Sequence, residues 1–162
     1  MKRIGLMSDT HGWWDDRYLT HFHDCDEIWH AGDIGSTLII ERLQEHCTVR
    51  AVYGNIDSCE LRKRFDGIIK FHIEKCNVIM THIGGYPGKY APQIRDLIYN
   101  EHPKLLISGH SHILKIMYDN TVGCLHINPG AAGRQGWQQV RTLVKFTLDG
   151  IDIRDIEIIE LA

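Results

Sequence analysis

Apolar and polar positions alternate in blocks over the first third of the chain. Apolar runs predict three short, buried β-strands, at 3–8, 27–31 and 48–53. The segments between these strands, 15–24 and 36–46, predict helices, and Ser36 is suited to cap the second helix. This alternation of strand and helix predicts parallel strands joined by crossover helices.

The rest of the chain has fewer helical patterns and more hairpin signals. A hairpin is expected from strands 68–73 and 78–81 around Lys75-Cys76-Asn77, followed by a helix at 92–102 and a strand at 105–108. Two more hairpins are expected from 113–118 with 122–127 around Asp119-Asn120, and from 141–148 with 151–161 around Asp149-Gly150. The pattern as a whole predicts a single α/β domain over residues 1–162 with two sheets.

Composition supports a folded, soluble protein. Of the 162 residues, 43% are apolar and 24% are charged, which argues against disorder, collagen and coiled coil. The apolar stretch at 4–7 is too short for a secretory signal, and no run approaches the roughly 18 residues needed to span a bilayer. We therefore expect a cytoplasmic protein with no membrane contact.

The five cysteines are widely spaced and form no C-x-x-C pair, so reduced, mostly buried thiols are expected.

The charge of the chain argues against duplex nucleic acid as a partner. The net charge is -3, and no basic cluster is denser than Arg62-Lys63-Arg64.

Histidine, with 11 residues, is unusually frequent. Because histidine is the commonest metal ligand and an acid or base near neutral pH, the positions of these residues matter.

Polar side chains that bind metals or move protons follow five of the expected strands. They are Asp9 and His11, Asp33, Asn55, His82, and His110 with His112. In open α/β sheets, ligands bind beyond the carboxyl ends of the strands, so these groups can converge on one place. Oxygen and imidazole ligands without thiolate suit a pair of divalent cations such as Mn, Fe, Zn or Ni.

A charge count favours a phosphate ester as the ligand of such a site. Two divalent ions bring four positive charges, and Asp9 and Asp33 remove two of them, whereas the amide and imidazole ligands remove none. With a bound hydroxide the site keeps a net charge of about +1, which suits an anionic phosphate ester.

Each of these residues also has a structural explanation. Asp9, His11 and Asp33 are common loop and turn residues, and Asn55 after Gly54 is expected in a left-handed turn position. Gly109-His110-Ser111-His112 is the hardest block to explain structurally, because alternation along an extended segment would send both imidazoles to the same side. The placement of the whole set at strand ends favours function.

The order and spacing of these blocks resemble the calcineurin-like metallophosphoesterases. The resemblance is carried by Asp9-Thr10-His11, Gly32-Asp33, Gly54-Asn55, His82 and Gly109-His110-Ser111-His112. The short chain and Asn128-Pro129-Gly130 resemble the small bacterial and archaeal phosphodiesterase branch. That branch is similar in fold to a eukaryotic retromer subunit that serves mainly as a protein-binding scaffold. The resemblance implies a four-layer α/β/β/α sandwich of two mixed sheets flanked by helices.

The resemblance also implies roles for the individual residues. One ion would be held by Asp9, His11 and His112, and the other by Asn55, His82 and His110, with Asp33 as the bridge. Asn55 and His112 are also assigned to substrate binding. A hydroxide shared by two ions about 3.5 to 4 Å apart would be the nucleophile, with no side chain in that role. Mn²⁺ is the first choice of metal, and Ni²⁺, Zn²⁺ and Fe²⁺ are the alternatives.

Two positions depart from the family pattern. Many members have a histidine after the motif asparagine, where it protonates the departing oxygen, but this chain has Ile56. General-acid help, typically worth about 10² to 10⁴-fold, is therefore absent at that position. In Thr81-His82-Ile83-Gly84 the second histidine of many members is missing, although the expected ligand is retained. The glycine-rich loop 84–90 that follows either covers substrate or simply connects to the next helix.

The remaining candidates have weaker signals. Asp57-Ser58-Cys59-Glu60 fits a capping box, so Asp57 is expected to cap a short helix through Phe65. His30 is a candidate neighbour of the metal ligands, His126 precedes the Asn-Pro-Gly turn, and Arg134 is expected to be a surface arginine. We treat His21, His23, His46, His72 and His102 as non-functional.

The sequence thus predicts a two-metal phosphoesterase that prefers small phosphodiesters. The alternative is a scaffold that keeps the fold and binds a partner protein without turnover. Because no metal-ligand position of the family is lost, the sequence favours the enzyme. It leaves open the physiological substrate and the oligomeric state.

Overall fold

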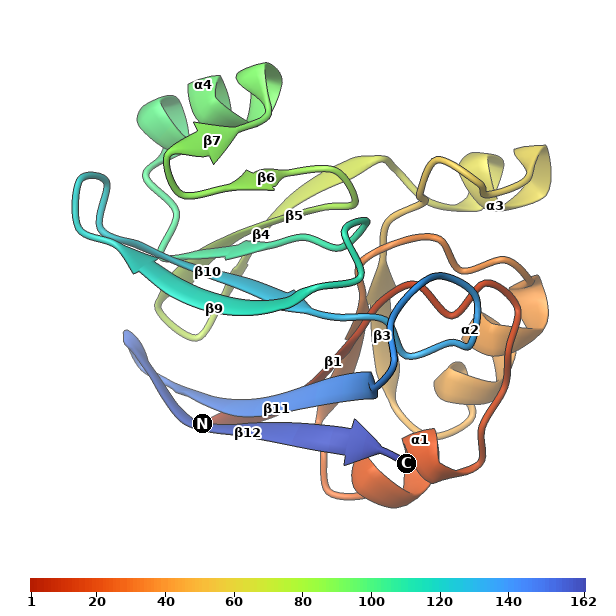
Figure 1. Ribbon diagram of the computed structural model, residues 1–162. Helices are drawn as coiled ribbons and strands as arrows, with labels where there is room; N and C mark the ends of the chain where they lie inside the picture. Colours follow the sequence, from red (N-terminus) through yellow and green to blue (C-terminus); the bar gives the residue numbers. More distant parts are fainter.

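The computed structural model describes residues 1–162 and consists of two five-stranded sheets packed face to face, with helices outside them (Figure 1). The first sheet has the strand order β12-β11-β1-β2-β3. Its strands are β1 (Lys2–Met7), β2 (Glu27–His30), β3 (Thr48–Ala51), β11 (Arg141–Asp149) and β12 (Asp152–Leu161). As predicted from the alternation of strand and helix, β1, β2 and β3 are parallel, whereas β11 and β12 are antiparallel to their neighbours.

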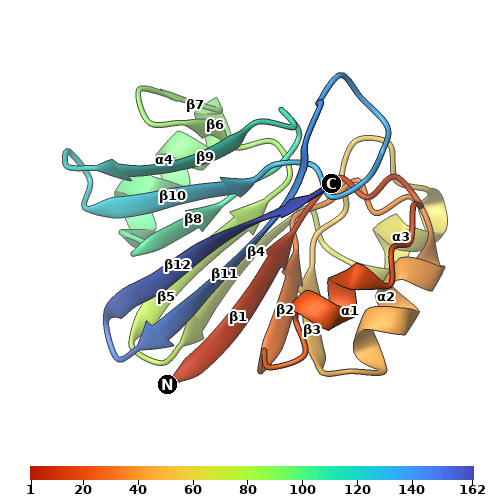
Figure 2. The same cartoon turned by 60° about the horizontal axis from the view of Figure 1, so that its bottom comes forward.

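The second sheet has the strand order β4-β5-β8-β10-β9 and is also mixed. Its strands are β4 (Ile68–Ile73), β5 (Cys76–Thr81), β8 (Leu105–Ile107), β9 (Leu114–Asp119) and β10 (Cys124–Pro129). Strands β5, β8 and β10 are parallel, and β4 and β9 form antiparallel edges. Figure 2 shows the first sheet lying over the second, so that the two sheets enclose a common core.

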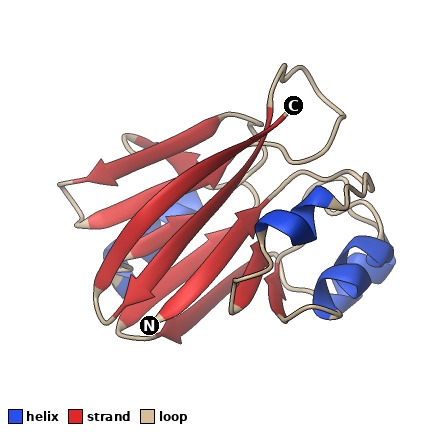
Figure 3. Cartoon of the chain, turned by 90° about the horizontal axis from the view of Figure 1, so that it is seen from below, coloured by secondary structure: helices blue, strands red, loops and turns tan.

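Four short helices lie outside the sheets: α1 (Arg17–His21), α2 (Thr37–Gln44), α3 (Cys59–Arg64) and α4 (Pro92–Glu101). Helix α1 is shorter than the expected 15–24. Helix α2 starts as predicted, because the Ser36 side chain accepts a hydrogen bond from the Leu38 backbone N–H at 3.2 Å. Figure 3 shows these helices on the outside of a strand-rich centre. None of them combines the length and apolar character that a membrane crossing requires.

Three apolar clusters fill the three spaces between the four layers. The space between the sheets holds Ile4, Leu6, Val78 and Met80, among other residues. Neighbouring positions on the same strands face outward: Met7 packs with residues of α1 and α2, and Ile79 packs with residues of α4. This alternation follows from the two-residue period of strands and makes both sheets apolar on each face. The predicted four-layer sandwich is therefore confirmed.

One hairpin differs from its expected boundaries, and another was not predicted. The turn after β4 is formed by Glu74 and Lys75, because Cys76 pairs with Ile73 and its side chain is buried between the sheets. Glu74 has the left-handed backbone that this tight turn requires. In the glycine-rich loop, β6 (Gly85–Tyr86) and β7 (Lys89–Tyr90) form a small hairpin that was not predicted. All five cysteines are free and three are buried, as expected.

Candidate metal centre

The polar residues at the strand ends meet at one end of the sandwich, where loops of both sheets come together. The loop after β1 carries Asp9 and His11, and the loops after β2 and β3 carry Asp33 and Asn55. The second sheet contributes His82 after β5, and His110 and His112 after β8. The two sheets are joined here by a hydrogen bond of 3.1 Å from the His110 backbone N–H to the side-chain oxygen Asp9 Oδ2. All seven predicted positions therefore belong to one site.

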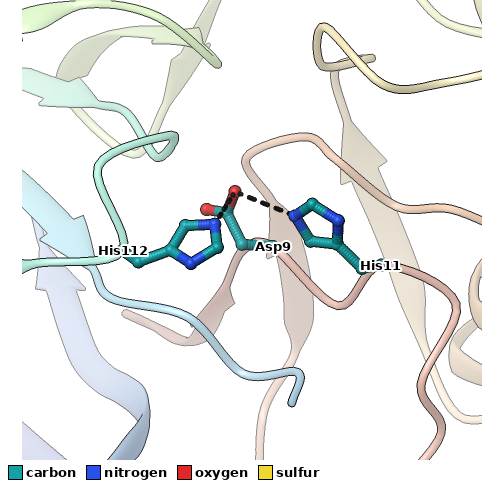
Figure 4. Close-up of side chains that lie close together, drawn as sticks. All are labelled: Asp9, His11 and His112. Carbon is teal, nitrogen blue, oxygen red and sulfur yellow. Dashed lines mark ion pairs between the residues drawn. The ribbon is translucent and has the colours of Figure 1, made fainter. Parts of the chain in front are cut away.

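The first set of ligand atoms comes from Asp9, His11 and His112, which we call the closed group (Figure 4). Asp9 Oδ1 lies 3.2 Å from His112 Nε2 and 3.8 Å from His11 Nε2. The Asp9 side chain is fully buried, and those of His11 and His112 are only 9% and 11% exposed. A cation between these atoms would be almost completely enclosed by protein.

The second set comes from Asp33, His82 and His110, which we call the open group. Asp33 Oδ2 lies 3.2 Å from His82 Nε2, and both side chains are buried. The His110 residue is exposed, and its Nδ1 lies 3.0 Å from the exposed Asn55 Oδ1. The carboxamide oxygen of Asn55 is thus placed beside this group, as the resemblance implied.

Asp33 lies between the two groups. Its Oδ2 is 3.4 Å from His11 Nε2 of the closed group and 3.2 Å from His82 Nε2 of the open group. Its other oxygen, Oδ1, accepts a hydrogen bond of 3.1 Å from the Ile56 backbone N–H. One oxygen is therefore held by the protein while the other is available to both groups.

Hydrogen bonds outside the site fix the direction in which the histidines point. His82 Nδ1 lies 2.8 Å from the Ala31 carbonyl, which can only accept, so the neutral ring carries its proton there and presents a lone pair at Nε2. The same argument applies to His112, whose Nδ1 is 2.8 Å from Gln138 Oε1. The Gln138 amide is oriented by its Nε2, which donates to the carbonyls of Gly133 and Gln135. Metal-binding histidines are commonly held in this way.

Several buried atoms of the site have no hydrogen-bond partner, which tests whether metal ions fit. Only four buried side-chain nitrogen or oxygen atoms of the protein are unpartnered. Three of them are Asp9 Oδ1, His11 Nε2 and His82 Nε2, all directed to the same place. An unpaired buried polar atom costs about 1–3 kcal/mol, so clusters of them are rare without a ligand. Divalent cations satisfy these carboxylate and imidazole donors, and the site fits them.

Electrostatics favour positive charge at the same place. Burial alone would raise the pKa of Asp9, but contacts from His11 and His112 outweigh it and hold this pKa well below the usual range. Burial likewise would lower the pKa of His82, yet the Asp33 and Asp9 carboxylates raise it overall. Two buried carboxylates surrounded by imidazoles are stabilised by protons or by metal cations.

The backbone at most ligand positions is left-handed. Positive φ values are found at Asp9 (55°), His11 (47°), Asp33 (53°), His110 (72°) and His112 (61°). Such a conformation is sparsely populated outside glycine and costs on the order of 1 kcal/mol or more per residue, so its concentration at one site indicates function. Asn55 is not among these residues, which removes the left-handed turn as its explanation. His110 and His112 converge through this turn backbone and not through strand alternation, so that part of the prediction is wrong.

The glycines of the motifs allow the backbone to pass close to the ligands. A Cβ atom on Gly54 would collide with the Asp33 carboxylate, and one on Gly109 would collide with Ser8 Oγ. The Ser8 hydroxyl is needed where it is, because it donates a hydrogen bond of 2.6 Å to Asp9 Oδ2. The Gly-Asn and Gly-His pairs are therefore explained by packing against the two carboxylates.

The prediction that Asp57 caps helix α3 is wrong. The N-cap of α3 is Ser58, whose side chain accepts from the Leu61 N–H, because the carboxylate of Asp57 is used elsewhere. Asp57 is buried and accepts hydrogen bonds from the backbone N–H groups of Ile34 (3.1 Å), Gly35 (2.8 Å) and Gly54 (2.8 Å). It therefore ties the loop that carries Asp33 to the turn that carries Asn55.

Three other candidates have structural contacts. His30 is buried, which lowers its pKa to about 4, and its ring hydrogen-bonds Thr10 Oγ1 and the Gly32 N–H. His126 is also buried, with Nε2 2.8 Å from Ser108 Oγ. Arg134 is exposed and stacks on Trp13, as expected for a surface arginine. Gln138 was missed because nothing in the irregular segment around it indicates a contact with His112.

Ile56 lies at the surface of the site and brings no acidic or basic group. Its side chain is 47% exposed, and its backbone N–H donates a hydrogen bond to Asp33 Oδ1. A cavity of about 450 Å³ opens beside Asn55 and His82, and another of about 200 Å³ lies beside His110. The hairpin β6–β7 lines the second cavity through Gly85 and Tyr86.

A two-sheet sandwich with carboxylate, imidazole and amide ligands at the strand ends defines a candidate metalloprotein. Residues 1–150 match the calcineurin-like phosphoesterase superfamily domain, and the chain belongs to this family. Members of the family use divalent metals, in agreement with the two ligand groups.

Two archaeal relatives match much of the sequence. A probable metallophosphoesterase of Methanothermobacter thermautotrophicus is 34% identical over 119 residues, which cover 67% of this chain and 66% of that protein. Another, of Methanocaldococcus jannaschii, is 32% identical over 135 residues, which cover 79% of this chain and 67% of that protein. The match thus spans about two thirds of the length of these curated relatives.

Solved structures with the same fold include proteins of two kinds. An archaeal phosphodiesterase superposes with a TM-score of 0.74 at 23% identity, covering 98% of this chain and 99% of that one. Vps29 of Entamoeba histolytica in complex with Zn²⁺ superposes with a TM-score of 0.73 at 13% identity, covering 98% of both chains. At these identities the likeness establishes only the fold. The activity follows from the residues of the site.

Proposed function

We propose that this protein is a two-metal phosphoesterase that hydrolyses small phosphodiesters. The observation that carries the proposal is the convergence of Asp9 Oδ1, His11 Nε2 and His82 Nε2, three buried atoms without protein partners. Binding a partner protein does not require such atoms, whose burial without a ligand is costly, whereas metal-dependent hydrolysis does. Residues 1–162 act as a single domain in this proposal.

In the proposed site residues of both sheets would hold each ion. Asp9, His11 and His112 would hold one ion, and Asn55, His82 and His110 would hold the other, with Asp33 shared between them. Divalent ions supply Lewis acidity and a water of lowered pKa when bound to such a pair of sites. Mn²⁺ is the first choice, and Ni²⁺, Zn²⁺ and Fe²⁺ satisfy the same donors.

The chain's own residues exclude one form of catalysis and support binding. Ile56 has no proton to donate to a departing oxygen, so substrates whose leaving group needs no protonation, such as aryl esters, are favoured. Asn55 and His112 also contact the substrate in this proposal. The position of Asn55 agrees with this role, because it is exposed at the edge of the larger cavity. The hairpin β6–β7 lies beside His110 and would contact one ester arm of the substrate, that is, one of the two groups esterified to its phosphate.

The second candidate function is a protein-binding scaffold, favoured by the likeness in fold to Vps29. The two functions are separated by hydrolysis of bis(p-nitrophenyl) phosphate with added Mn²⁺. We expect release of p-nitrophenolate by the wild-type protein and none by Asp33→Asn. Absence of hydrolysis with Mn²⁺, Ni²⁺, Co²⁺ and Zn²⁺ alike would favour the scaffold.

A further inference from the structure

The larger cavity beside the candidate metal centre is lined by the positively charged side chain of Arg62 and by no acidic residue. It has a volume of about 450 Å³ and extends from Asn55 and His82 of the site to Arg62, Tyr53 and Gln93. None of its lining residues is an aspartate or a glutamate. A substituent of a bound phosphodiester that extends from the open group into this cavity therefore enters a positively charged space.

Arg62 is held in a fixed position within this space. Its Nε donates to the Asp57 carbonyl at 2.9 Å, and its Nη2 donates to the Asn55 carbonyl at 3.0 Å. The guanidinium also lies over the Tyr53 ring, 4.8 Å from the centroid. Because both partners are backbone carbonyls, these bonds orient the side chain without neutralising its charge.

The charge of Arg62 has no counterion in the protein. No carboxylate lies within 4.0 Å of its nitrogens, whereas Arg17, Arg50 and Arg141 each pair with one. Its Nη1 makes no hydrogen bond and remains available for a ligand. Guanidinium groups bind phosphate oxygens through parallel N–H donors, and an oriented one loses little entropy on binding.

We propose that this cavity is a subsite for a second phosphate group, carried on one ester arm of the phosphodiester, and that Arg62 binds it. The inference rests on the proposed function, because the second phosphate is defined relative to the one at the metal centre. Arg62 contacts the backbone of Asn55, whose side chain reaches the open group, so the two anionic groups are neighbours. The favoured substrates are therefore phosphodiesters with an additional phosphate near the scissile one.

A matched pair of substrates tests the subsite. The p-nitrophenyl ester of thymidine 5′-phosphate and its 3′-phosphorylated counterpart differ only in the second phosphate, and both release p-nitrophenolate. Charge-assisted contacts of this kind are worth roughly 10- to 100-fold, so we expect the wild type to prefer the 3′-phosphorylated ester by that factor in kcat/KM, mainly through KM. Arg62→Ala should abolish the preference, and Arg62→Lys should restore part of it.

The controls separate binding from a structural role. Arg62 also holds the turn around Asn55, and a purely structural effect would slow both esters equally and leave their ratio unchanged. Arg64→Ala removes a neighbouring arginine of α3 outside the cavity and should preserve the preference. Equal kcat/KM for the two esters in the wild type, or an unchanged ratio in Arg62→Ala, would overturn the subsite.

Binding distinguishes failure of the subsite from failure of the proposed function. Calorimetric titration with thymidine 5′-phosphate and thymidine 3′,5′-bisphosphate should give tighter binding of the bisphosphate, lost in Arg62→Ala. If this preference is found without hydrolysis of either ester, the subsite stands and the phosphoesterase proposal fails. If hydrolysis is found while both nucleotides bind equally, the subsite fails and the phosphoesterase proposal stands.

Discussion

The two ligand groups of the candidate metal centre differ in their access to solvent. In the closed group Asp9 is fully buried, and both histidines are about one tenth exposed. In the open group Asp33 and His82 are buried, but His110 and the neighbouring Asn55 are exposed. Both cavities next to the site border the open group. The comparison teaches that an ion in the closed group would be shielded from solvent, whereas the open group is accessible from both cavities.

The largest effect is expected where the two groups meet. Asp33→Asn removes the negative charge that lies between His11 and His82, so both ions should bind less well. We expect a loss of metal affinity greater than the roughly 100-fold typical of outer contacts, together with loss of hydrolysis. Titration of the apoprotein with Mn²⁺ measures it, with Asp96→Asn on the exposed face of α4 as the control. Unchanged Mn²⁺ occupancy in Asp33→Asn would show that Asp33 does not bridge the two ions.

A change confined to the closed group should affect one ion more than the other. Gln138→Ala removes the acceptor that holds Nδ1 of His112, and its expected cost is roughly 10- to 100-fold in the affinity of one ion. Two-step Mn²⁺ titration measures this, and Gln139→Ala, which changes the exposed neighbouring residue, should have no effect. If Gln138→Ala lowered the affinity for both ions equally, the two groups would not be independent binding sites.

Asp57 connects the loops that carry Asp33 and Asn55, so its loss should weaken the fold as well as the site. Asp57→Ala leaves three buried or partly buried backbone N–H groups without their charged acceptor. We expect the free energy of unfolding to fall by about 3 kcal/mol. Urea denaturation measures this loss, and Asp66→Ala, a change at an exposed aspartate, is the control. If Asp57→Ala were no less stable than Asp66→Ala, Asp57 would not connect the loops.

The smallest effect is expected at the solvent-exposed edge of the open group. Ile56→His places an ionisable group beside Asn55 and should raise turnover of phosphomonoesters by about 10-fold, below the full range of general-acid catalysis because the new imidazole has no orienting partner. Steady-state assay of p-nitrophenyl phosphate measures the gain. Ile56→Gln, which is polar but cannot donate an acidic proton, should show none. No gain in Ile56→His would mean that the missing acid does not limit turnover.

Much of the fold and the composition of the site could be predicted from local sequence patterns. Apolar runs locate the strands, and their alternation with helices requires β1, β2 and β3 to be parallel, so Asp9, Asp33 and Asn55 fall at one edge. The four-layer arrangement was implied by the family resemblance, and it agrees with the apolar residues that β5 and β8 carry on both faces in the structure. These features depend on residues close together in the sequence.

Features that depend on contacts between distant segments could not be predicted in this way. The capping pattern at Asp57 is locally correct, but backbone N–H groups more than 20 residues away provide better partners for a buried carboxylate. Gln138 reaches His112 across 26 residues from a segment without periodicity. The left-handed backbone at the ligands is likewise imposed by the surrounding loops. Hairpin β6–β7 was missed because its strands are only two residues long.

The central claim is that Asp33 bridges two neighbouring divalent ions. Electron paramagnetic resonance of the Mn²⁺-loaded protein tests it most directly, combined with the metal content per chain. Ions about 3.5 to 4 Å apart are exchange-coupled, so the account predicts two Mn²⁺ per chain and the spectrum of a coupled pair. A single Mn²⁺ per chain, or two ions with the spectrum of isolated Mn²⁺, would contradict it.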